Sequence, residues 1–219
     1  MGSVHYLLII PSSPALIREL APAHQPSRQL QEKITETIHE LCSAYVEHIE
    51  LVFPKNNRDY TKLTGSFQAW GASSVNVAAG NYLPELVARY LIGVTYQHRI
   101  CTVTEHLSYE SYGKAQNVLT IVLADGSAGL NAQAPLSEVA GSWQAHQLCQ
   151  EICSGKLPPY ATNMENLSAW LSTRGVVEPQ PWVELATFLQ SGKVTQASVF
   201  AVDDSLGVGR YCALWQCRA

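Results

Sequence analysis

The chain has 219 residues, of which 47% are hydrophobic and 15% are charged, and its formal net charge is −4. This composition is typical of a globular protein with a sizeable core, and the acidic balance argues against nucleic-acid binding, which usually needs a basic patch. No apolar run reaches the roughly 20 residues that span a membrane, and the N-terminus lacks the features of a secretory signal. We therefore expect a single domain over residues 1–219, located in the cytoplasm, without nucleic-acid or membrane partners.

The first third of the chain predicts two strands separated by a helix. The apolar run Val4–Ile10 fits a buried strand that Pro11 ends. Ser27 is expected to be the N-cap of the helix. The apolar stripe of that helix would consist of Leu30, Ile34, Ile38, Leu41 and Tyr45. A second strand follows at 48–53, and Pro54 ends it.

The middle of the chain predicts a long loop and four further elements. The polar stretch 55–73 reads as the loop. After it we expect a short strand, a helix that begins at a proline, and two strands, at 74–77, 84–96, 99–105 and 117–124.

The C-terminal part predicts three helices and two strands. A helix should run from Ser137 to Gly155, and shorter helices should follow a Pro-Pro linker at 163–173 and 181–190. The last two strands are expected at 197–202 and 210–216. The alternation of strands and helices predicts an α/β fold with a mostly parallel central sheet, helices on both faces and a C-terminal antiparallel strand pair.

The cysteines form no Cys-x-x-Cys pair, and in a chain of this length we expect buried thiols rather than disulfides. They are Cys42, Cys101, Cys149, Cys153, Cys212 and Cys217. His146, Cys149 and Cys153 recur along one side of a predicted helix, a spacing that can bind zinc. The same spacing continues through Val139 and Trp143, so we favour a stripe of core residues.

Small polar residues follow three of the predicted strands. In a parallel sheet the carboxyl ends of the strands face the ligand crevice, although turns after strands also favour such residues for conformational reasons. The residues expected to line this crevice are Ser12, Ser13, Lys55, Asn56, Asp125 and Ser127. With Lys55 supplying a positive charge, the ligand would be a small anionic or aromatic molecule.

Four segments resemble the class III extradiol dioxygenase superfamily, which includes LigB-like ring-cleaving subunits and Memo-like proteins. They are 9–20, 52–56, 123–128 with the following Ala134-Pro135, and 207–215, the last being similar to the tail of compact bacterial members. The resemblance implies an α/β scaffold and an Fe(II) ion held by two histidines and a carboxylate, with open positions for a catechol and dioxygen.

The chain departs from this family at each position where the resemblance calls for histidine. Ser12 stands at the first metal-ligand position, Lys55 or Asn56 at the second, and Ala128 at the acid/base position. The carboxylate ligand would be Glu178 or Glu184. These replacements indicate a degenerate metal site without a cofactor, kept as a small-molecule binding or interaction module.

Two enzymatic alternatives remain open at this point. One is an Fe(II) extradiol ring-cleaving dioxygenase whose metal ligands lie a few residues away from the aligned positions. The other is a metal-free, hydrolase-like site around Ser12, Lys55, Asp125 and Ser127, with His106 as a proton carrier. Ser127 lies in a sequence similar to the Gly-x-Ser-x-Gly elbow, but no histidine follows His146 to complete that triad. Relatives often pair, so the apolar strand at 211–215 could support a homodimer or close the sheet.

Overall fold

The computed structural model describes residues 4–107, 117–161 and 164–218. Its centre is a six-stranded sheet, in which four parallel strands are extended by two antiparallel ones. In spatial order the strands are β5 (Ile100–Thr104), β2 (His48–Val52), β6 (Val118–Leu123), β1 (Val4–Ile10), β8 (Arg210–Arg218) and β7 (Val194–Asp203). This confirms the predicted α/β class, including the C-terminal antiparallel pair.

The central strands are β1 and β6, and they pair in parallel from His5 with Val118 to Ile10 with Leu123. All six residues of β6 are buried, as expected where helices cover both faces of a parallel sheet and the strands read as continuous apolar runs. The pairing continues one residue further, because the Ala124 amide donates a hydrogen bond to the Ile10 carbonyl. The segments that follow these two strands therefore begin side by side.

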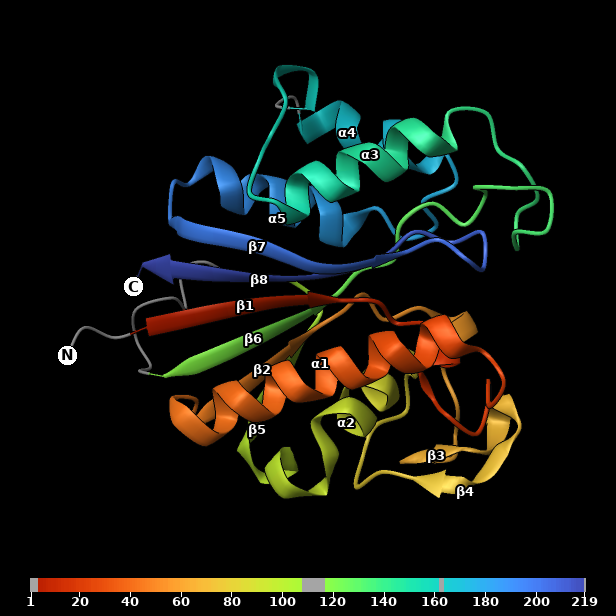
Figure 1. Cartoon of the computed structure of the whole chain (residues 1–219), viewed down its shortest axis with the longest axis vertical. Helices are drawn as coiled ribbons and strands as arrows, with labels where there is room; N and C mark the ends of the chain where they lie inside the picture. Colours follow the sequence, from red (N-terminus) through yellow and green to blue (C-terminus); the bar gives the residue numbers. More distant parts are fainter. Residues whose placement is uncertain (1–3, 108–116, 162–163, 219) are drawn as a thin grey trace.

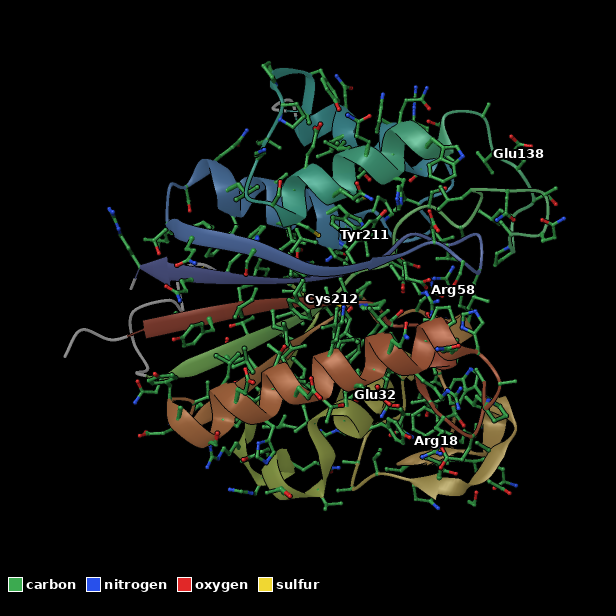
Figure 2. All side chains as sticks on the ribbon, viewed as in Figure 1. Arg18, Glu32, Arg58, Glu138, Tyr211 and Cys212 are labelled. Carbon is green, nitrogen blue, oxygen red and sulfur yellow. The ribbon has the colours of Figure 1, made fainter. Side chains whose placement is uncertain are left out.

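Helices cover both faces of the sheet (Figure 1). One face carries α1 (Gln25–Ala44) and α2 (Leu83–Tyr96), and the other carries α3 (Ser142–Cys153), α4 (Met164–Ser172) and α5 (Gln180–Gln190). Side chains alternate along a strand, so each strand contributes to both cores. Figure 2 labels Tyr211 and Cys212 on opposite sides of β8, and they belong to the two different cores.

The start and end of α1 differ from the prediction. The N-cap is His24, whose Nδ1 accepts a hydrogen bond from the Ser27 amide, and the helix begins at Gln25. Ser27 is fully buried in the first turn, where its hydroxyl accepts a hydrogen bond from Arg210. Tyr45 follows the last helical residue and its side chain is 61% exposed, so it does not extend the apolar stripe.

The start of α3 also differs from the prediction. Ser137 has a positive φ of 56° and lies in a turn, and the helix begins only at Ser142, after a left-handed Gly141. Val139 therefore precedes the helix, and Trp143 is 53% exposed rather than part of a core stripe. The sequence pattern at 137–141 does not distinguish this turn from the first turn of a helix.

The remaining elements agree with the prediction in place and type. The short strand predicted at 74–77 corresponds to β4 (Ala72–Asn76), and it pairs with β3 (Ser66–Phe67), which lies within the predicted loop and was not expected. Short 3₁₀ helices lie at Pro14–Leu16, Asn57–Asp59, Gln68–Trp70, Gln97–Arg99 and Pro159–Ala161. The apolar tail strand β8 lies between β1 and β7, so both of its edges are paired within the sheet. None of the described helices has the length and apolar character needed to cross a membrane.

The six cysteines are all free thiols. Five are buried, which agrees with the expectation, whereas Cys101 on the edge strand β5 is exposed. Burial raises the pKa of the Cys149 and Cys153 thiols. These two thiols therefore pack as small apolar groups of the core between the sheet and α3.

Candidate functional site

A cavity of about 410 Å³ lies at the carboxyl ends of β1 and β6. Ser12 and Ser13 come directly after β1, and Asp125 and Gly126 come after β6. Pro11 ends β1, so Ser12 and Ser13 leave the sheet and line the cavity together with the residues that follow β6. This is the edge at which open α/β sheets bind ligands.

Most of the cavity wall is apolar. The apolar lining residues come from six separate segments, and they are Pro14, Ala15, Pro54, Leu83, Pro84, Leu123, Ala128, Pro135, Val177, Leu206 and Val208. The polar lining side chains are fewer, and they are Ser12, Ser13, Arg58, Asp59, Asp125 and Glu178. The volume and this mixture of apolar wall and few polar groups are typical of small-molecule sites.

Asp125 is held in place by Ser12 and by α5. The Ser12 amide lies 3.2 Å from each Asp125 carboxylate oxygen, and the Ser12 hydroxyl donates to Oδ2. The Trp182 indole N–H donates to the Asp125 carbonyl oxygen at 2.7 Å. Desolvation raises the pKa of the Asp125 carboxyl, although the hydrogen bonds from Ser12 and the charge of Arg210 act in the opposite direction.

A second polar group on the wall is centred on Arg58. Its Nη2 lies 3.0 Å from Glu178 Oε1, and its Nε lies 3.3 Å from Asp59 Oδ2. Asn56 contacts both partners of this ion pair. Its Nδ2 donates to the same Glu178 oxygen at 2.7 Å, and its Oδ1 accepts from the Arg58 amide. Arg58 is therefore engaged by two carboxylates at the cavity wall, and Figure 2 labels it at this end of the sheet.

The structure brings together three of the six residues expected to line the crevice. Ser12, Ser13 and Asp125 line the cavity, whereas Lys55 and Asn56 do not. Asn56 contacts the wall through its hydrogen bonds with Glu178 and with the Arg58 amide. The Lys55 ammonium lies 3.6 Å from Glu105 Oε1, so the cation on which the expectation of an anionic ligand depended lies off the described wall.

The sixth expected residue, Ser127, is fully buried and does not line the cavity. Its hydroxyl donates to the Arg174 carbonyl at 2.7 Å and accepts from the Gly129 amide at 3.2 Å. A nucleophile elbow needs an exposed Oγ, and this Oγ instead joins the segment after β6 to the segment after α4. No described contact links Lys55 to Ser127 or to Ser12, so the Ser–Lys pair is not formed.

His106 lies beyond β5 and away from the cavity wall. Its side chain is 74% exposed, and its Nδ1 lies 2.9 Å from Glu184 Oε1 and 2.8 Å from Gln180 Nε2. Glu184 also accepts a hydrogen bond from the Leu107 amide. These contacts attach the end of β5 to α5. Of the two carboxylates that the resemblance offered as a ligand, Glu178 lines the cavity and Glu184 does not.

The three α3 residues whose spacing could bind zinc, His146, Cys149 and Cys153, make contacts within the protein. His146 Nδ1 lies 2.7 Å from the Tyr211 hydroxyl, and its Nε2 lies 2.7 Å from Gln150 Nε2. Cys149 and Cys153 are fully buried in the same core. Within the described ranges, no group of three or more His, Cys, Asp or Glu side chains is arranged to hold a metal ion.

The donor set at the cavity does not fit the iron site that the resemblance implies. That site needs two imidazoles and a carboxylate, but the described wall carries no imidazole. Ser12 stands at the first ligand position and uses its hydroxyl as a donor to Asp125. Ala128, at the acid/base position, lines the cavity with a methyl group, which cannot transfer a proton.

Sequence reasoning missed Arg58, Asp59 and the role of Glu178 on the wall. Arg58 and Asp59 lie in the short 3₁₀ helix Asn57–Asp59 that follows β2 and Pro54, so their place after a strand end was the available signal. Comparison of the chain with protein-family models and with curated proteins finds no match. The family resemblance therefore rests on the four sequence segments described above.

Proposed function

We propose that the protein is a metal-free member of the LigB-like superfamily that binds a small molecule in the cavity at the carboxyl ends of β1 and β6. The observation that carries this proposal is the cavity itself, with its largely apolar wall and its two groups of ordered polar side chains. Pre-formed cavities of this kind are the usual sites of ligand binding. An aromatic ring would suit the apolar part of the wall.

The residues at the family positions favour binding over ring cleavage. Iron-dependent cleavage needs ligands that coordinate the metal and a group that transfers a proton. Ser12 and Ala128 supply neither. The scaffold and its crevice are retained in this proposal, and the metal chemistry is lost.

One observation favours a second candidate, a metal-free enzyme. Asp125 faces the cavity with a raised pKa and accepts a hydrogen bond from the Ser12 hydroxyl. Carboxyl groups with raised pKa in cavities are candidates for proton transfer at neutral pH. In this alternative Asp125 accepts a proton from a bound substrate, and Asp125→Asn abolishes turnover while ligand binding persists.

The test of the binding proposal is a fragment screen with a variant that closes the cavity. Val177 lines the cavity and is 43% exposed, so Val177→Trp can fill the entrance without disturbing a core. Val202 on β7 is 42% exposed and lies off the cavity wall, which makes Val202→Trp a matched control. Binding is read by protein-observed NMR titration and by the shift in melting temperature.

We expect small aromatic fragments to bind the wild-type chain and the Val202→Trp variant, but not the Val177→Trp variant. Fragments that bind all three chains equally, or none of them, would contradict the proposal. Self-association stays a separate prediction, and sedimentation of the purified chain at several concentrations tests it.

A further inference from the structure

The ionisable side chains on the cavity wall are unbalanced in charge. Among the described lining residues they are one guanidinium, Arg58, and three carboxyl groups, Asp59, Asp125 and Glu178. Lys55 lies off the wall and beside Glu105. The potential inside such a cavity attracts positive charge, because its apolar wall screens the carboxylates poorly.

Arg58 does not offset this imbalance for a ligand. Both of its ion pairs are with other wall residues, Asp59 and Glu178. These two pairs engage Nε and Nη2, and an anion that bound the remaining N–H donors of Arg58 would lie close to both carboxylates. Among the wall residues that the structure describes, the single cation is therefore already paired with two carboxylates.

Asp125 is the wall carboxyl for which the structure describes no ion pair. No described cation lies within 4.0 Å of its carboxylate; the ion pairs on this side of the molecule involve other acids. Arg210 is the adjacent cation, but its guanidinium is fully buried and binds Asp203 and Ser27. A half-buried carboxylate without an ion pair is poorly solvated, which agrees with the raised pKa of this group.

The Asp125 carboxylate also keeps hydrogen-bonding capacity. Ser12 contributes one N–H and one O–H donor, whereas a carboxylate offers about four acceptor sites. A ligand nitrogen with several N–H donors can use the sites that remain. The Ser13 hydroxyl lines the same wall and can accept another of its N–H groups.

We propose that the ligand of this cavity carries a positively charged nitrogen, such as a primary ammonium or an amidinium, on a small apolar or aromatic body, and that Asp125 binds the nitrogen. The apolar body lies against the proline and leucine side chains of the wall. This proposal rests on the proposed binding function and specifies its ligand class. It replaces the anion that Lys55 had suggested with a ligand of the opposite charge.

The test uses three probes of nearly equal size and different charge: benzylamine, benzyl alcohol and benzoate. Each is titrated by protein-observed NMR at pH 7 into the wild-type chain, Asp125→Asn and Val177→Trp, with Val202→Trp as the control. A hydrogen bond to a charged partner in a poorly solvated site is worth roughly a tenfold or greater change in affinity. We expect benzylamine to bind at least about tenfold more tightly than benzyl alcohol, and benzoate to bind most weakly.

In Asp125→Asn we expect the affinity for benzylamine to fall to that for benzyl alcohol, whose own affinity changes little. Equal affinities of the three probes in the wild-type chain, or tighter binding of benzoate, would overturn the proposal. A preference for benzylamine that survives Asp125→Asn unchanged would also overturn it, because the nitrogen would then bind elsewhere.

A second variant keeps the test decisive if Asp125→Asn does not fold. Glu178→Gln removes another wall carboxylate that is partly exposed, and we expect it to weaken benzylamine binding several-fold and to strengthen benzoate binding. An unchanged ranking with unchanged affinities would count against the proposal. Failure of the binding function is distinguishable, since then no probe binds in a way that Val177→Trp abolishes.

Discussion

Asp125 and Arg210 are backbone neighbours, joined by an antiparallel bridge, yet their side chains occupy opposite kinds of environment. Arg210 is fully buried, and its guanidinium binds Asp203 and Ser27, which ties β8 to β7 and α1. Asp125 faces a cavity and has only the uncharged donors of Ser12. A compensated charge holds the fold together, whereas an uncompensated one at a cavity indicates a site for a ligand.

The largest effect on stability should come from removing Arg210, the cation of the buried pair with Asp203. Arg210→Met leaves Asp203, whose side chain is 12% exposed, without its cation. Removing one partner of a buried pair costs about 3 kcal/mol, so we expect the free energy of unfolding to fall by roughly this amount. Urea denaturation followed by circular dichroism measures it. The double variant Asp203→Asn/Arg210→Met should recover part of the loss, and a loss below about 1 kcal/mol for Arg210→Met would contradict a structural role.

The next effect concerns Gly126 and Tyr211, which follow Asp125 and Arg210 in the sequence. A Cβ on Gly126 would lie 2.5 Å from the Tyr211 hydroxyl oxygen and 3.0 Å from the Gly209 carbonyl oxygen. Overpacking of this kind costs about 1–3 kcal/mol, so Gly126→Ala should lower the free energy of unfolding by that amount. Tyr211→Phe removes the clashing hydroxyl, and the double variant should therefore lose less than the sum of the two single variants. Strict additivity in denaturant melts would show that the contact is absent.

The titration of Asp125 should appear in the pH dependence of stability. The pKa of Asp125 is raised in the folded state by desolvation, against the lowering effect of Ser12 and Arg210 and with a small raising effect from Asp59. The folded chain therefore binds this proton more tightly than the unfolded chain does. Its contribution to stability is fully present below the ordinary pKa of 3.8 and is lost as the pH rises through the raised folded-state pKa.

Asp125→Asn removes this proton and its titration. We expect the wild-type chain to lose stability relative to Asp125→Asn as the pH rises from 4 toward 8, measured as the difference in melting temperature at each pH. A difference that stays constant over this range, or that changes in the opposite direction, would show that Asp125 is ionised without penalty in the fold.

The smallest effect is expected at Lys55, the cation first associated with the cavity. Its side chain and that of Glu105 are 37% and 47% exposed, and their charged atoms are 3.6 Å apart. Exposed pairs contribute about 0–1 kcal/mol, so Lys55→Ala should change stability by less than about 0.5 kcal/mol and leave benzoate binding unchanged. A clear loss of benzoate affinity in the NMR titration would restore Lys55 as a ligand-binding residue.

The central strands β1 and β6 could be predicted closely because each is an apolar run that a proline or a small polar cluster ends. The polar residues at the start of β7 hid its first three positions, and the two-residue strand β3 was not predicted. Helix starts were harder, because several side chains compete for the capping position. Ser27 has the side chain of an N-cap, but His24 takes that role and Ser27 is buried against Arg210. Ser137 follows an apolar residue in a helix-like pattern, yet its left-handed backbone places it in a turn.

The candidate site could be predicted only where it follows directly from the strand ends. Ser12, Ser13 and Asp125 line the cavity, since parallel strands end at one edge of a sheet. Glu178 reaches Arg58 and Asn56 across more than a hundred residues, and no local pattern reports such a contact. Ser127 was placed on the crevice because its neighbours are small and polar, but a hydrogen bond to the Arg174 carbonyl draws it inward.

The origin of the cavity wall has a consequence for folding. Its lining residues extend along the sequence from Ser12 to Val208, so no fragment of the chain contains the whole pocket. A ligand therefore recognises the completed fold and not an intermediate, and its binding free energy adds to the stability of the molecule as a unit. Amides far from the pocket, including those in the central strands, should then exchange with solvent more slowly when the pocket is filled.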